Sequence, residues 1–260
     1  SLAIAEKIGS NFDEFLNACL IGAETSCRIG GWIGMNHYKF GFHNTATIGI
    51  FGATLSCCRL LNLNQKQTIY AIGIAASKAS GLKSQFGTMG KPYHAGMAAS
   101  NAVESAFLAK EGFVSSPYSF AGEQSFAKTH LGQFNNIFID DLGKSFIFDD
   151  VLHKYHACCH GLHATIESLK KIIKNNQNIN KNQIKKINVF INPKWLKVCN
   201  ILTPKTGLEI KFSFRMICSL VFFGYDTAAL DTYSDKLCKE KKLVLIRDKV
   251  FVNEDLELND

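Results

Sequence analysis

The feature that most constrains the fold is a series of helical segments in which small residues recur among the apolar ones. Between residues 1 and 112, apolar side chains return every three or four positions, as they do on one face of an α-helix. Residues 94–110 are typical, because one face of this segment carries Gly and Ala and another carries larger apolar side chains. Small faces let helices approach closely, so this part of the chain is expected to form a tightly packed helical domain.

Helices are expected at residues 12–20, 47–61, 65–80 and 94–110. Residues 113–150 are rich in Gly, Ser and Phe, and such aromatic content indicates a packed, irregular connection with short helices. Beyond it the pattern changes: helices are expected at 161–173, 212–223 and 227–237, and strands at 184–191 and 243–252. The predicted fold class is therefore a mostly α large domain at 1–150 and a smaller α+β domain at 151–260, each of them partial.

The composition is that of a globular protein. The chain of 260 residues is 47% hydrophobic and 20% charged. Its most apolar stretches, 46–58 and 217–225, are shorter than the roughly 20 residues that span a bilayer, so no membrane association is expected. Nine Cys without a repeating spacing, including two adjacent pairs, favour free thiols in a reducing, cytoplasmic compartment.

The net charge of +7 raises the possibility of a nucleic-acid partner. The positive charge is concentrated in residues 170–197, a Lys- and Asn-rich tract with little aromatic interleaving, which is typical of a solvated helix end and loop. No nucleic-acid binding is therefore expected. Lys and His within Gly-rich loops fit a small anionic ligand better.

Two loops in the first part carry candidate functional residues. Residues 41–47, with the sequence Gly-Phe-His-Asn-Thr-Ala-Thr, hold His43 just ahead of a helix that Thr45 or Thr47 could cap, a reasonable position for binding a carboxylate. Residues 87–96 present Lys91, Tyr93 and His94 in a Gly-rich loop stiffened by a proline, ahead of the next helix. Both loops are interpreted as parts of a ligand site.

A third candidate segment, residues 153–163, has the highest density of titratable side chains in the chain. It contains Lys154, His156 and His163, and it lies at the predicted domain boundary, where ligands commonly bind. A zinc site is the rival interpretation, since His156 and His160, or His160 and His163, have the spacing of one helix face. The segment lacks a Cys-x-x-Cys pair and a His-Glu-x-x-His motif, so no metal and no other cofactor is expected.

Together these groups suit proton chemistry beside a carboxylate. Removing such a proton creates an enolate-like dianion, which fixed cations and N–H donors can stabilise. Imidazoles supply a base and an acid near neutral pH. Elimination, hydration, decarboxylation and epimerisation of a di- or tricarboxylate all remain open at this point.

In this order and spacing, the three loops resemble those of the MmgE/PrpD family of metal-independent lyases, and the resemblance spans nearly the whole chain. Further matching segments are residues 48–53, 75–77, 80–81, 203–209 and 211–213. The resemblance implies a large helical domain, a smaller α+β lid, an active site between them, and a homodimer. It implies as substrate a small polycarboxylate such as 2-methylcitrate or cis-aconitate, to be dehydrated or decarboxylated.

The family's active-site positions correspond to His43, Lys91 and Lys154 of this chain. The resemblance implies that the two lysines bind substrate carboxylates and that His43 transfers a proton. Residues expected to line the substrate are Tyr93, His94, His156 and His163.

One departure from the family pattern concerns the start of the chain. Family members carry an Asp-Asp-Thr motif and a further His upstream, and no residue here matches them. The alternative hypothesis is therefore a catalytically inactive remnant, or one half of a split enzyme.

Overall fold

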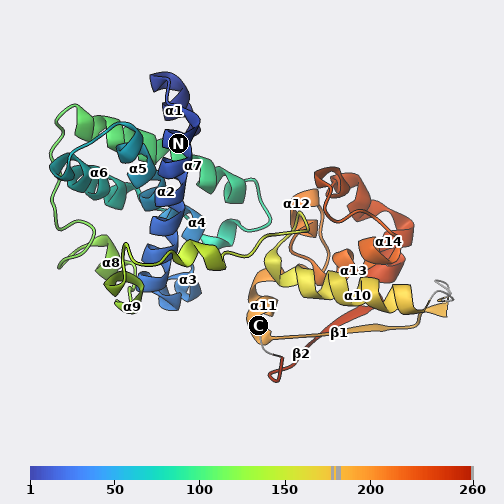
Figure 1. The fold of residues 1–260 in the computed structure, drawn as a ribbon. Helices are drawn as coiled ribbons and strands as arrows, with labels where there is room; N and C mark the ends of the chain where they lie inside the picture. The colour runs from blue at the N-terminus through green and yellow to red at the C-terminus, as the bar shows by residue number, and fades with distance from the viewer. Residues whose placement is uncertain (177–178, 180–182, 259–260) are drawn as a thin grey trace. The chain divides into compact units, whose positions relative to one another are not determined.

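The computed structural model describes residues 1–176, 179 and 183–258. The chain forms two compact units: residues 1–84 with 90–151 make up unit 1, and residues 85–89 with 152–260 make up unit 2 (Figure 1). The described part of unit 1 is helical, and that of unit 2 combines helices with one two-stranded sheet. The predicted fold class is confirmed, whereas the division into domains 1–150 and 151–260 stays a prediction, because compactness does not test independent folding.

Unit 1 is built around a bundle of long helices. Asn11 and Asn64 begin two of them with capping boxes, in which the Asn side chain accepts from the third residue of the helix and that residue's side chain accepts from the Asn backbone. The helices of this unit are α1 Leu2–Ile8, α2 Phe12–Ile33, α3 Met35–Phe40, α4 Asn44–Thr47, α5 Gly49–Leu60, α6 Gln65–Lys78, α7 Gly90–Lys110, α8 Phe126–Thr129 and α9 Ile137–Asp140, with a 3₁₀ turn at Ile147–Asp150.

Helix α5 is the centre of this bundle, with α2, α6 and α7 packed around it (Figure 1). Two glycines permit the close approach of α2 and α5. A Cβ on Gly22 would lie 2.8 Å from the carbonyl oxygen of Gly52, and one on Gly52 would collide with the carbonyl oxygen of Gly22 and with the hydroxyl of Ser26. The expectation of helices packed through small residues is thus fulfilled at this crossing.

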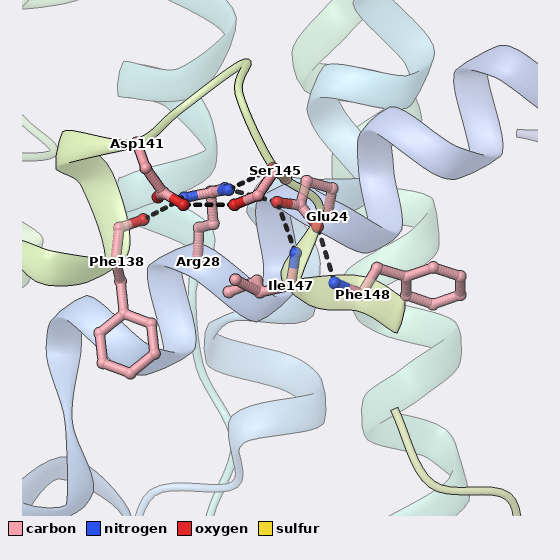
Figure 2. A network of polar contacts seen from close by, with 7 residues as sticks. All are labelled: Glu24, Arg28, Phe138, Asp141, Ser145, Ile147 and Phe148. Atoms are coloured by element: carbon pink, nitrogen blue, oxygen red, sulfur yellow. Dashed lines mark hydrogen bonds and ion pairs between the residues drawn. The ribbon is translucent and has the colours of Figure 1, made fainter. Parts of the chain in front are cut away.

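The buried side chain of Arg28 links residues 138–145, which follow α7 in the chain, to the helical bundle (Figure 2). Arg28 of α2 is only 2% exposed. Its Nε lies 2.5 Å from Glu24 Oε1 and its Nη1 lies 2.6 Å from Asp141 Oδ1. The guanidinium also donates to the carbonyl oxygens of Phe138 and Ser145, at 2.9 and 2.6 Å. Four acceptors thus compensate the desolvation of this cation.

Glu24 extends this network to the next turn of the chain. Its carboxylate accepts from the backbone N–H of Ile147 at 3.2 Å and of Phe148 at 2.9 Å (Figure 2). The pKa of Asp141 is lowered by the hydroxyl of Ser145 and by Arg28. Residues 113–150 are therefore a packed connection with short helices, as the sequence predicted.

Unit 2 places a parallel pair of strands among short helices. Strands β1 Ile187–Ile191 and β2 Val250–Glu254 pair in register from Ile187 with Val250 to Ile191 with Glu254. Residues Leu162, Ile166, Phe214, Ile217, Leu220 and Leu243 lie at the centre of its core. The helices are α10 His163–Asn175, α11 Pro193–Cys199, α12 Gly207–Ile210, α13 Phe214–Phe222 and α14 Lys241–Arg247, with 3₁₀ turns at His160–Leu162, Leu230–Thr232 and Asp235–Lys239.

Two predicted elements of unit 2 are wrong. Residues 227–237 form separate 3₁₀ turns, not one α-helix. The strand expected at 243–252 begins only at Val250, because Leu243 and Ile246 lie one helical turn apart and are both buried by α14. Of the Lys-rich tract at 170–197, residues 177–178 and 180–182 lie outside the described part of the chain.

Two further expectations concern bulk properties of the chain. None of the helices in the described ranges has both the length and the apolar character that a bilayer span requires. All nine Cys are free thiols, and six of them are buried.

The α2–α5 crossing generates a stability prediction. Gly52→Ala is expected to destabilise unit 1 by about 1–3 kcal/mol, because the added methyl group must push two helices apart. Gly49→Ala, in the first turn of the same helix, adds a methyl group that meets no atom within 4 Å and should change stability by at most about 1 kcal/mol. Urea unfolding of both variants compares them, and equal effects would contradict the packing argument.

Candidate functional site

His43 lies at the start of α4 in unit 1 and is 5% exposed. The residue itself occupies the N-cap position, and neither Thr45 nor Thr47 caps the helix, contrary to the sequence interpretation. The backbone N–H of His43 donates to the carbonyl oxygen of Gly81 at 3.0 Å. This bond joins the His43 loop to the segment that precedes the next candidate residues.

Lys91 and His94 lie in the first turns of α7, which begins at Gly90. The sequence placed them in a loop ahead of the helix, and this was wrong because Pro92 is compatible with the first turn, where its missing N–H leaves no bond unmade. Their spacing of three residues puts Lys91 and His94 on one helix face. Tyr93, between them in sequence, is 63% exposed.

The imidazoles of His43 and His94 are in direct contact. Their Nδ1 atoms lie 3.0 Å apart, so one ring donates and the other accepts. Gly81 makes room for this pair: its φ is +149°, and a Cβ there would lie 2.7 Å from Ala46 Cβ and 3.4 Å from His94 Nδ1. Residues 80–81 belong to a segment that matches the family pattern, but the sequence gives no sign that Gly81 lies beside His94.

The environment of His43 strongly disfavours its charged form. Burial, the positive charge of Lys91 and the neighbouring His94 together lower the pKa of His43 to about 4. At neutral pH this imidazole is therefore an uncharged proton acceptor next to a cation. An anion that neutralised Lys91 would raise the basicity of His43, which is a useful property in a base that acts only once substrate is bound.

In unit 2, His156 is held by two hydrogen bonds. Its Nε2 lies 2.8 Å from Glu167 Oε1, and its Nδ1 lies 2.8 Å from the hydroxyl of Thr227. His156 is 5% exposed, whereas the carboxylate of Glu167 faces solvent. Glu167 follows His156 by 11 residues and Thr227 by 71, and no local pattern pointed to either of them.

Three further groups of the 153–163 segment gather beside His156. The ring of His163 packs edge-on against that of His156, with centroids 4.9 Å apart, and stacks on that of His160, with centroids 5.1 Å apart. Burial, both neighbouring imidazoles and Lys154 lower the pKa of His163. Its Nε2 is buried without a hydrogen-bond partner among the described residues, and the exposed Lys154 donates to the carbonyl oxygen of Cys158 at 3.5 Å. This cluster combines one cation with a neutral, available ring nitrogen.

The zinc interpretation finds no geometric support in these contacts. Both ring nitrogens of His156 already have partners, and His160 and His163 stack face to face. No group of three His, Cys, Asp or Glu side chains within the described part of the chain is arranged to hold a metal ion.

Burial raises the pKa of the Cys158 thiol to about 11, which keeps it protonated at neutral pH.

The structure thus forms two local groups from the predicted residues. His43, Lys91 and His94 come together in unit 1, and Lys154, His156 and His163 come together in unit 2. Each group combines an ammonium with imidazoles, one of which has a lowered pKa: His43 in unit 1 and His163 in unit 2.

Comparison with known proteins identifies the family. The sequence profile of the MmgE/PrpD N-terminal domain matches residues 1–138, and that of the MmgE/PrpD C-terminal domain matches residues 156–260. The chain belongs to the MmgE/PrpD family. The resemblance read from the three loops is confirmed.

Two curated relatives resemble this chain. One is named "cis-aconitate decarboxylase-like protein oryM", from Aspergillus oryzae, and is 31% identical over 172 residues, covering 62% of this chain and 36% of the relative. The other is the cis-aconitate decarboxylase of Aspergillus terreus, 28% identical over 188 residues, covering 66% of this chain and 37% of the relative. The matched region thus spans little more than a third of the length of these relatives.

The low basicity of His43 can be tested directly. In an NMR titration of the full chain, the His43 ring is expected to protonate near pH 4. In Lys91→Met, loss of the cation should raise the pKa of His43 only part of the way toward 6.5, because burial lowers this pKa more than Lys91 does. Lys110→Met, at the far end of α7, is the control and should leave the titration of His43 unchanged. A wild-type His43 titrating near 6.5 would contradict the burial argument.

Burial of neutral imidazoles also makes stability depend on pH. The pKa values of His37, His43, His130 and His163 are lowered in the folded chain, so the unfolded chain takes up protons first as the pH falls below about 6.5. The free energy of unfolding is therefore expected to decrease between pH 7 and pH 5. Urea unfolding at both pH values should show a smaller decrease for His43→Asn than for the wild type or for His153→Asn, whose side chain is exposed.

Proposed function

We propose that the chain carries the activity of a metal-independent lyase, a dehydratase or decarboxylase, acting on a small di- or tricarboxylate such as 2-methylcitrate or cis-aconitate. The observation that carries this proposal is the neutral His43 held 3.0 Å from His94 and electrostatically coupled to Lys91. A base, a second imidazole and an ammonium in one group are the parts that proton movement beside a carboxylate needs.

In this proposal Lys91 binds one carboxylate of the substrate and His43 transfers the proton. Binding of the anion offsets the charge of Lys91 and raises the pKa of His43 toward the working pH. His94 shares a proton with His43 through the Nδ1–Nδ1 contact and holds its ring in place. The exposed Tyr93 is proposed as a hydroxyl donor to the substrate.

The group in unit 2 is proposed to bind a further carboxylate. Lys154 supplies the charge, and His163 supplies the ring nitrogen that is buried without a partner among the described residues. His156 is proposed to contact the same carboxylate, held in orientation by Glu167 and Thr227. The positive charge of each group suits an anionic ligand.

The names of the two relatives support decarboxylation of cis-aconitate as the first reaction to test. Because the matched region covers 36% and 37% of those proteins, activity of this chain remains part of the proposal. Homodimerisation and independence from metal ions are proposed with it, as is a reducing cytoplasmic environment, which fits nine free thiols.

The decisive experiment is proton NMR of cis-aconitate, 2-methylcitrate and citrate in D₂O with the purified chain. Loss of CO₂, loss or gain of water, or deuterium exchange at carbon is expected with at least one acid. Lys91→Met should lower the rate by on the order of 10²–10³, as loss of a group that stabilises developing charge does.

Lys110→Met is the matched control for this assay and should retain the rate. Unchanged spectra for all three acids, together with a melting temperature that none of them shifts, would contradict the proposed function.

A further inference from the structure

A further imidazole, that of His37 in α3, packs against Phe42 of the His43 loop and is not used by the proposed reaction. His37 is 0% exposed. Its ring stacks on Phe42, the neighbour of His43, with centroids 4.6 Å apart and planes 4° from parallel. Burying an imidazole is unfavourable unless both ring nitrogens are partnered, so the identity of its partners is informative.

The partners of His37 determine its tautomer. Nδ1 lies 2.9 Å from the carbonyl oxygen of His130, which can only accept, so Nδ1 carries the proton. Burial lowers the pKa of His37 and keeps the ring neutral, which leaves Nε2 as an acceptor. Thr47 Oγ1 lies 2.7 Å from Nε2 and therefore donates to it.

Thr47 connects this ring to the backbone of His43. The N–H of Thr47 donates to the carbonyl oxygen of His43 at 3.1 Å, and Thr47 Oγ1 lies 3.3 Å from the same oxygen. The hydroxyl has one proton, and its shorter contact is the one to His37. On the other side, the N–H of His43 is bound to Gly81, so both backbone polar groups of His43 are fixed.

We propose that His37, acting through Thr47, is a positioning residue that holds His43 against His94. The chain of bonds runs from the His130 carbonyl through the His37 ring and the Thr47 hydroxyl to the turn that His43 begins. Each bond has a defined donor and acceptor, so the turn has one favoured orientation. The catalytic meaning of this arrangement rests on the proposed function, whereas the geometric claim does not.

The test compares Thr47→Val, which keeps the shape of the side chain but removes the hydroxyl, with Thr47→Ser, which keeps the hydroxyl. In Thr47→Val the His43–His94 ring contact is expected to weaken, seen as a loss of the NOE between ring protons. The pKa of His43 should then rise from about 4 toward 6.5 as water reaches the ring. Thr47→Ser should retain both wild-type values. A Thr47→Val variant with a lower melting temperature, but with the His43–His94 NOE and the pKa of His43 unchanged, would show that Thr47 has only a packing role. This result would overturn the proposal.

A measurement on the unmodified chain covers the case in which Thr47→Val does not fold. The ¹⁵N shifts of the His37 ring must show the tautomer with the proton on Nδ1, and the opposite tautomer would overturn the proposal.

Kinetics separate this proposal from the proposed function. If the wild type turns over cis-aconitate, Thr47→Val should lower kcat by on the order of 10²-fold at unchanged KM. If the wild type is inactive but Thr47→Val still releases His43, the lyase proposal fails and the positioning claim stands. If the wild type turns over cis-aconitate but Thr47→Val leaves the position of His43 unchanged, the lyase proposal stands and the positioning claim fails.

Discussion

The close approach of α2 and α5 is the constraint on which the candidate site in unit 1 depends. Gly22 and Gly52 bring the two backbones together, and α5 is also the helix against which α6 and α7 pack. Helix α4, whose N-cap is His43, is followed directly by α5, while His94 lies in α7. A bulkier side chain at the crossing would collide with the facing helix and push α2 and α5 apart.

The two groups of titratable residues differ in how their imidazoles are held. In unit 1, burial and the nearby ammonium of Lys91 lower the pKa of His43 and make its protonation costly. In unit 2, both ring nitrogens of His156 are hydrogen-bonded, one to Glu167 and the other to Thr227. The first arrangement suits a base, and the second suits a group that orients a ligand or its neighbours. This contrast is the reason for assigning proton transfer to His43.

Buried polar networks hold both the connection after α7 and the His43 loop. Residues 138–148 contain little regular structure, so few of their backbone groups bond to one another. The side chains of Arg28 and Glu24 bond to four of these groups instead (Figure 2). His37 likewise partners a backbone group outside the long helices, the carbonyl oxygen of His130, and its other ring nitrogen bonds the hydroxyl of Thr47. In both cases a side chain from an early helix satisfies backbone groups of an irregular segment.

The sequence by itself determined the class of fold, the family and the candidate residues, because helical periodicity and loop motifs are local patterns. It also predicted that helices in the first part of the chain pack closely through small residues, but it did not indicate that α2 and α5 would be such a pair. It misplaced the start of α7 and the division between α14 and β2, where an early proline and a short apolar run fit more than one local structure. Only the tertiary structure decided that His94 is the partner of His43, that Gly81 leaves room for the pair, and that Glu167 and Thr227 hold His156. Most of these contacts join residues far apart in the chain, and the burial that lowers the pKa of His43 exists only once the helices have packed.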